Sequence, residues 1–115
     1  MANLSDLQKK VVAFRDARDW KQFHNPKDVS LSLALEAAEL MEHFQWKSPG
    51  EIKKHLKAKN REVSEELMDV LYWVLLFAHD LGINIQDEFE RKMAQNEKKY
   101  PVSKAKGRYT KYSEL

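Results

Sequence analysis

Apolar residues recur at steps of three and four along most of this chain, which is the spacing of one face of an α-helix. This pattern predicts four main helices, over residues 5–19, 26–46, 60–81 and 84–100. A short polar helix that begins after Ser48 connects the second helix to the third. The connecting loops are short, and short loops place consecutive helices antiparallel to one another.

Residues that commonly begin or end helices stand at the expected boundaries. The predicted N-caps are Ser5, Asn25, Ser48, Asn60 and Asn84. Gln8 would complete a capping box with Ser5, and Pro26 suits the first position of the second helix. Gly82 and Pro101 are expected to end the third and fourth helices, because glycine readily adopts the left-handed conformation and proline cannot continue a helix.

The third predicted helix is apolar over about half of its circumference, which requires burial on more than one side. A small domain with a highly charged surface often completes its core by oligomerising. The sequence therefore predicts an all-α, antiparallel four-helix bundle over residues 1–100, followed by a basic, irregular tail over residues 101–115. We expect this bundle to be completed in a homodimer or homotetramer.

Composition narrows the possible functions. Charged residues make up 33% of the 115 residues, but the formal net charge is only +2, so the sequence does not predict a nucleic-acid partner. The absence of cysteine excludes thiolate metal sites and cysteine nucleophiles. The N-terminus lacks an apolar signal core, and no apolar run approaches the length of a membrane span. We therefore expect a cytoplasmic protein without a membrane partner.

Two pairs of acidic residues are the most informative feature of the pattern. Glu36 and Glu39 are three residues apart on the second predicted helix and therefore lie on one side of it, and Glu66 and Asp69 repeat this spacing on the third helix. Apolar residues flank both pairs, although a buried carboxylate costs several kcal/mol unless it is paired or binds a metal. If the pairs face each other, their oxygen atoms would select a hard cation, Mg²⁺ or Mn²⁺. The alternative is that these acids are solvated or paired with basic residues elsewhere.

At these residues the sequence resembles the all-α NTP pyrophosphatase superfamily, and within it the MazG-like and dCTP-pyrophosphatase group. The hallmark of that group is E-x-x-E followed by E-x-x-D, which is matched here by Glu36–Glu39 and Glu66–Asp69. Further segments that are similar lie at residues 18–26, 44–46, 92–101 and 111–115. The resemblance covers nearly the whole chain, and its ordered combination of motifs is more specific than either acidic pair.

The resemblance implies that Mg²⁺, with Mn²⁺ as a substitute, is held by all four acids. It also implies that water attacks the α-phosphorus of a nucleoside triphosphate and releases pyrophosphate. Such chemistry needs charge neutralisation and positioning more than a covalent nucleophile, and the candidate base towards the water is Glu39. The expected substrate is dCTP, or a modified or related pyrimidine deoxynucleotide, and the expected role is cleansing of the nucleotide pool.

Substrate-binding residues are also implied by the resemblance. The candidates for contact with the phosphates are Lys92, Asn96, Lys99, Tyr100 and Arg108, of which the first three lie on one stripe of the fourth predicted helix. The candidates for the base pocket are Trp20, Phe23, His24, Trp46 and Trp73. The alternative interpretations are a solvated helix face for the first set and ordinary core aromatics for the second.

Two rival functions remain open at this point. The first keeps the chemistry but broadens the substrate to many nucleoside triphosphates or to dUTP, because Trp73 stands where the dCTP enzymes carry tyrosine. The second is a non-catalytic helical interaction module, in which the acidic stripes pair with basic residues of a partner.

Overall fold

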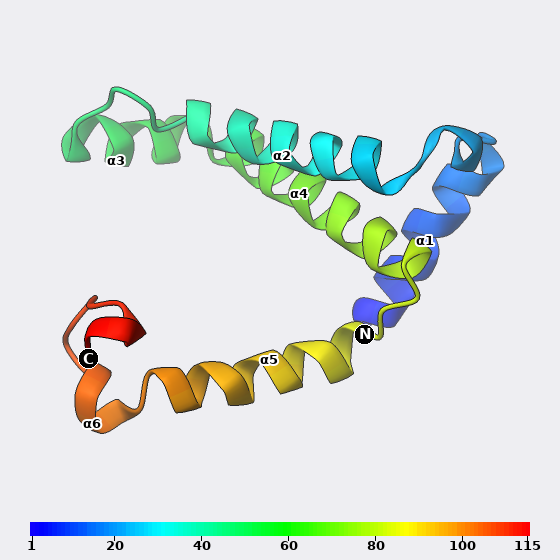
Figure 1. The fold of residues 1–115 in the computed structure, drawn as a ribbon. Coiled ribbons are helices and arrows are strands. Elements are labelled where there is room, and N and C mark those ends of the chain that lie inside the picture. The colour runs from blue at the N-terminus through cyan, green and yellow to red at the C-terminus, as the bar shows by residue number, and fades with distance from the viewer. The chain divides into compact units, whose positions relative to one another are not determined.

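The computed structural model describes residues 1–115 and contains helices but no strands, which confirms the predicted all-α class (Figure 1). The α-helices are α1 (Leu4–Ala17), α2 (Pro26–Glu42), α3 (Pro49–Ala58), α4 (Asn60–Asp80), α5 (Ile85–Lys99) and α6 (Val102–Ala105). Two 3₁₀ turns, η1 (Lys21–Phe23) and η2 (Tyr112–Glu114), complete the secondary structure.

Three of the predicted helix starts are confirmed. The side chains of Asn25, Ser48 and Asn84 each accept a hydrogen bond from the backbone N–H three residues further along the chain. Gly82 follows α4 with a φ of 67°, the left-handed conformation that glycine adopts without strain. Each of these residues acts on the backbone within one helical turn, so the local sequence is sufficient to predict these helix ends.

The other two predicted N-caps are wrong. Asn3 rather than Ser5 caps α1, and its side chain accepts a 2.9 Å hydrogen bond from the backbone N–H three residues on. Gln8 takes no part in a capping box, because its side-chain amide donates to the carbonyl oxygen of Leu75 on α4 at 2.9 Å. Asn60 forms no capping bond because it is already the first residue of α4, which begins directly after the end of α3.

Two further boundaries differ from the prediction. α2 ends at Glu42 rather than at residue 46. His43 and Phe44 donate their backbone N–H groups to carbonyls three residues earlier, which tightens the last turn, and Trp46 then adopts a φ of 66° that no helix can accommodate. The predicted irregular tail contains α6 and η2, so it is more regular than expected.

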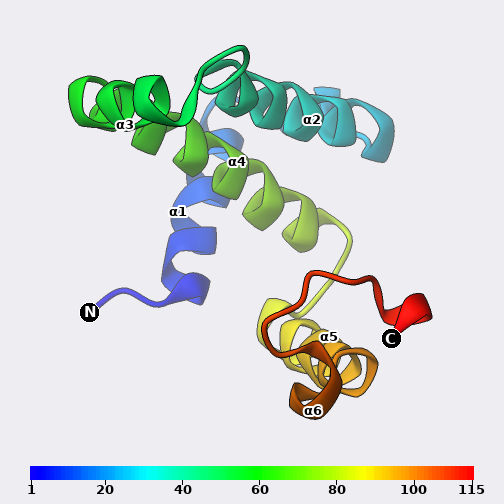
Figure 2. The same cartoon turned by 90° about the vertical axis from the view of Figure 1, so that its left-hand side faces the viewer.

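Residues 1–82 form one compact unit in which α4 packs against α1, α2 and α3. α2 runs antiparallel alongside α4, as both ribbon views show (Figures 1 and 2). The core of this unit is small and consists of Val29, Leu75, Leu76 and Ala78. The antiparallel pairing brings the middle of α2 beside the first half of α4, which is where the two acidic pairs lie.

Residues 83–115 form a second compact unit, which contains α5, α6 and η2. The packing of α5 into a four-helix bundle, the oligomeric state and the division of the chain at residue 100 stay predictions. Taken one at a time, the helices are too short or too polar to cross a membrane, and only α4 and α5 counted together as a broken pair reach the required length and hydropathy.

Arg15 on α1 is the one charged side chain that is completely buried. Its guanidinium donates to Asp16 at 3.1 Å and to Asp80 at the end of α4, and its Nη2 atom has no hydrogen-bond partner. A buried charge that loses its partner is strongly destabilising. The ion pair with Asp80 therefore fixes how α1 packs against α4.

We predict that Asp80→Asn lowers the free energy of unfolding by about 1.5–3 kcal/mol, the usual contribution of a hydrogen bond to a charged group. Asp16→Asn is the matched control, because Asp16 binds the same guanidinium but its side chain is 50% exposed, against 21% for Asp80. The control should cost less than about 1 kcal/mol, as exposed ion pairs do. Urea denaturation measures both, and equal losses in the two variants would contradict this account of the α1–α4 contact.

Candidate metal centre

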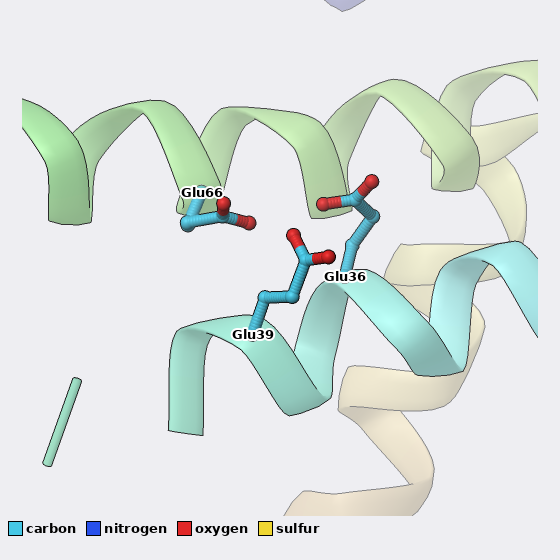
Figure 3. A group of neighbouring side chains, drawn as sticks. All are labelled: Glu36, Glu39 and Glu66. Carbon is cyan, nitrogen blue, oxygen red and sulfur yellow. The ribbon is translucent and has the colours of Figure 1, made fainter. Parts of the chain in front are cut away.

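Three carboxylates meet between α2 and α4 (Figure 3). Glu36 and Glu39 rise from the same face of α2, because residues three apart on a helix are neighbours. Glu66 points towards them from α4, and one oxygen from each of the three groups lies within 4.8 Å of the other two. This arrangement confirms the expected meeting of the two acidic stripes for three of their four residues.

None of these carboxylates has a basic partner. No Lys, Arg or His forms an ion pair with Glu36, Glu39 or Glu66, although the chain carries 20 Lys and Arg residues. The Oε2 atoms of Glu36 and Glu66 are buried and accept no hydrogen bond. Buried acceptors without a donor are rare in proteins, and these two oxygens are therefore available to a cation.

The donor set fits a hard divalent cation. All three groups offer carboxylate oxygens, which Mg²⁺ and Mn²⁺ prefer. The ligands of octahedral Mg²⁺ are about 2.9 Å apart when adjacent and about 4.2 Å apart when opposite, given metal–oxygen distances near 2.1 Å. The observed spread of 4.8 Å is close to that range. Small changes in side-chain torsion angles would therefore bring the three oxygens onto one ion.

Burial and the neighbouring acids dominate the electrostatics of the cluster. Burial raises the pKa of Glu36 to about 7, and the nearby carboxyl groups of Glu66, Glu39 and Asp69 add to the shift. Burial also raises the pKa of Glu66 above its ordinary value, and the charges of Glu39 and Asp69 act in the same direction. A cation would reverse this balance, because it favours the charged form of every carboxylate around it.

Asp69 completes the E-x-x-D motif but lies outside the group of three. Its side chain is exposed on α4, one turn beyond Glu66. It is close enough to raise the pKa of both Glu36 and Glu66 by repulsion. Its role as a metal ligand stays a prediction. Its negative charge nevertheless acts on two carboxyl groups of the cluster.

Two of the predicted base-pocket residues are brought together. The ring of His24 packs edge-on against the ring of Trp73, with 5.4 Å between their centroids. His24 has a buried Nδ1 without a hydrogen-bond partner, and its pKa is lowered by burial and then by the nearby charge of Arg15. Trp73 is one turn beyond Asp69 on α4, so this aromatic pair lies on the same helix as the acids.

The other predicted base-pocket aromatics lie apart from this pair. Trp20 packs edge-on against Phe14, with 5.8 Å between the ring centroids. Phe23 and Trp46 are 64% and 91% exposed. Their roles in binding a base stay predictions.

The predicted phosphate-binding residues all belong to the second unit. They are Lys92, Asn96, Lys99, Tyr100 and Arg108. Within that unit, the ammonium group of Lys99 lies 4.6 Å from the centre of the Tyr112 ring, and Tyr100 packs edge-on against the same ring at 5.9 Å. Tyr112 is thus the residue that holds two of the candidates in place. Their contact with the phosphates stays a prediction.

The ion pair between Arg15 and Asp80 is not predicted from the sequence. The signal for Arg15 is its spacing, since Gln8, Val11 and Arg15 recur at helical steps on the face of α1 that meets α4. A charge at a core position of an amphipathic helix requires a partner, but the partner here is 65 residues away in the sequence. No spacing rule identifies that partner.

The fold and the cluster define a class: small all-helical proteins with carboxylates from two antiparallel helices that suit a hard cation. Residues 31–115 match the model of the MazG-like family, and the chain belongs to this family. It is 36% identical over 114 residues to dCTP pyrophosphatase 1 of Rattus norvegicus, and 34% identical to dCTP pyrophosphatase 1 of Homo sapiens. Each match covers 97% of this chain and 67% of the relative.

A solved structure is also similar. The crystal structure of a pyrophosphatase from Archaeoglobus fulgidus superimposes with a TM-score of 0.80 at 38% sequence identity. The match covers 88% of this chain and 94% of the other. The family resemblance inferred from the acidic motifs is therefore confirmed by sequence and by fold.

The raised pKa of Glu36 predicts how stability depends on pH when no divalent cation is present. The folded protein keeps a proton on Glu36 up to about pH 7, whereas the unfolded chain loses it near the ordinary pKa of 4.5. The stabilisation from this proton is therefore complete below pH 4.5 and is lost as the pH rises through 7.

In EDTA, the free energy of unfolding should thus fall between pH 5 and pH 8 by more in the wild type than in Glu36→Gln, which stays uncharged. Glu65→Gln, a neighbouring exposed acid on α4, should retain the wild-type dependence. Urea denaturation across this pH range measures the difference. Superimposable profiles for the wild type and Glu36→Gln would show that Glu36 is not protonated in the folded state.

Proposed function

We propose that this protein is a Mg²⁺-dependent nucleotide pyrophosphohydrolase that converts dCTP, or a closely related pyrimidine deoxynucleoside triphosphate, to the monophosphate and pyrophosphate. The observation that carries the proposal is the convergence of Glu36, Glu39 and Glu66 between α2 and α4. Membership of the MazG-like family and the relatives named dCTP pyrophosphatase 1 support the choice of reaction and substrate. We further propose that the activity cleanses the cytoplasmic nucleotide pool.

The roles of the acids follow from their exposure. Glu36 and Glu66 present buried oxygens without partners and would hold the ion, together with Glu39 and Asp69. A bound Mg²⁺ would neutralise phosphate charge and acidify a bound water. Glu39 is the exposed member of the group of three, and we assign it the proton that the attacking water loses. The water oxygen bonds to the α-phosphorus as the bond to the bridging oxygen breaks, and pyrophosphate leaves.

The base would be bound by aromatic side chains. Stacking on an aromatic ring contributes roughly 1–3 kcal/mol per base. His24 and Trp73 already form an aromatic pair beside the acids, and exposed Trp46 offers a further ring surface. We include Trp20 and Phe23 in this pocket, and assign the phosphates to the polar residues of the second unit named above.

An oligomer would cover the apolar surface that remains exposed on α2 and α4. Leu31 and Leu35 on α2 are 55% and 64% exposed, and Leu67 and Met68 on α4 are 49% and 52% exposed. Exposed apolar residues on two neighbouring helices are typical of an interface between protein chains. This exposure supports the predicted homodimer or homotetramer.

One feature of the family resemblance favours a broader substrate range. Trp73, which contacts His24, has no hydroxyl group that could select among bases, whereas the resemblance places tyrosine there in the dCTP enzymes. A non-catalytic interaction module is the weaker alternative. Basic residues of a partner could not reach the buried oxygens of Glu36 and Glu66.

We predict that the purified protein with Mg²⁺ hydrolyses dCTP to dCMP and pyrophosphate with kcat/KM at least tenfold above the values for dUTP, dATP and ATP. Ion-exchange chromatography of the products separates pyrophosphate from single phosphate and ranks the four substrates in one experiment. Similar rates for all four would favour the broad-specificity enzyme. Release of single phosphate, or no turnover with any nucleotide, would rule out the proposed reaction.

Glu39→Gln tests the assignment of the base. Removing a general base typically lowers the rate by about 10²–10⁴-fold, and the amide keeps the shape of the side chain. Glu65→Gln is the matched control, since it removes one exposed carboxylate from α4 outside the cluster. The control should keep wild-type kcat, and circular dichroism should show that both variants are folded. Wild-type kcat in Glu39→Gln would exclude the assignment.

A further inference from the structure

A pair of histidines lies outside the carboxylate cluster, where α2 ends and α3 follows. His43 is the C-cap residue of α2, and His55 lies in the second half of α3. The Nδ1 atom of His43 and the Nε2 atom of His55 are 2.8 Å apart, and both side chains are half-buried. At this distance one ring N–H donates to the lone pair of the other ring nitrogen, so the two imidazoles share one proton.

Local structure holds this pair in place. α2 ends in a tight turn, and the capping box between Ser48 and Glu51 fixes the start of α3. The ring of Phe44 packs against both histidines, with 6.3 Å between its centroid and each imidazole centroid. Both rings are therefore fixed by the backbone and by packing, as a preformed metal site requires.

The surroundings favour the uncharged form that binds metals. Burial lowers the pKa of His55, and the positive charges of Lys47, His43 and Lys59 lower it further, while Glu62 opposes them. At neutral pH this imidazole is therefore neutral. The charge of Glu62 raises the pKa of His55, so a negative charge lies near the pair.

The spacing of the two nitrogens suits adjacent ligands of one metal ion. With metal–nitrogen distances near 2.0–2.1 Å, two ligands at a right angle are about 2.9 Å apart, and two ligands at the tetrahedral angle are about 3.3 Å apart. The observed 2.8 Å matches the right angle of octahedral or tetragonal coordination. Imidazole ligands in such geometries are typical of Ni²⁺ and Cu²⁺, whereas Mg²⁺ prefers oxygen.

We propose that His43 and His55 form a second metal site, which binds a transition-metal ion that prefers imidazole. It is separate from the carboxylate centre in its residues and in the class of metal. An ion held there joins the end of α2 to α3 and closes the segment that carries Trp46. Metal binding replaces the hydrogen bond between the rings, because the shared proton must leave before both lone pairs can bind one ion.

The test is calorimetric titration of the full chain, without a histidine tag, with Ni²⁺ in saturating Mg²⁺ so that the carboxylates are already occupied. The wild type should bind one Ni²⁺ per chain. His43→Gln and His55→Gln should each lose at least tenfold in affinity. His79→Gln, an exposed histidine of α4, and Glu36→Gln should bind Ni²⁺ like the wild type.

Electron paramagnetic resonance with Cu²⁺ gives a second readout that does not depend on stability. The wild type should show hyperfine splitting from two nitrogens, and each histidine variant from one at most. The melting temperatures of the variants without metal establish that they are folded. The proposal is overturned if Ni²⁺ does not bind the wild type, if His55→Gln binds it equally well, or if Glu36→Gln alone loses it, which would place the ion at the carboxylates and leave the histidines a hydrogen bond only.

Discussion

The central constraint in this structure is the crowding of acidic groups between α2 and α4, where no basic residue pairs with them. Packing α2 against α4 requires the oxygens of Glu36 and Glu66 to leave water, and neither receives a hydrogen bond in return. A carboxyl group whose pKa is about 7 remains partly protonated at neutral pH, which relieves the repulsion only in part. Helix packing therefore creates a local negative potential, which either a proton on Glu36 or a bound cation would relieve.

α4 satisfies two opposite requirements along its length. Its second half contributes Leu75, Leu76 and Ala78 to the core, and this apolar contact holds α1 and α2 against it. Its first half presents Glu66 to the acids of α2, where apolar packing is replaced by charge. The two regions share one helix. The apolar contacts of its second half therefore hold the acid of its first half in place. A site built on helices in this way keeps its geometry better than one built on loops.

The features that the sequence predicts correctly are those that depend on one helical turn or on the spacing of residues along a helix. Asn25 and Ser48 cap their helices through bonds to residues three positions away, and the spacing of Glu36 and Glu39 alone places them on one face. It could not predict the boundary at Trp46, since that residue has a φ of 66° that its side chain does not favour. Nor could it pair Arg15 with a carboxylate on another helix, because such a contact depends on how the helices pack.

The buried Arg15 connects the packing of α1 to the chemistry proposed for the base pocket. Its guanidinium is held by Asp80 on α4, and its positive charge helps to lower the pKa of His24. A neutral imidazole beside Trp73 retains one donor and one acceptor nitrogen, which an uncharged base can hydrogen-bond, whereas a charged imidazolium offers two donors. The guanidinium that joins α1 to α4 thus adds to the lowering of the His24 pKa that burial causes. In the proposed base pocket, this helix packing would therefore act on the hydrogen-bonding groups of His24 rather than on the carboxylate cluster.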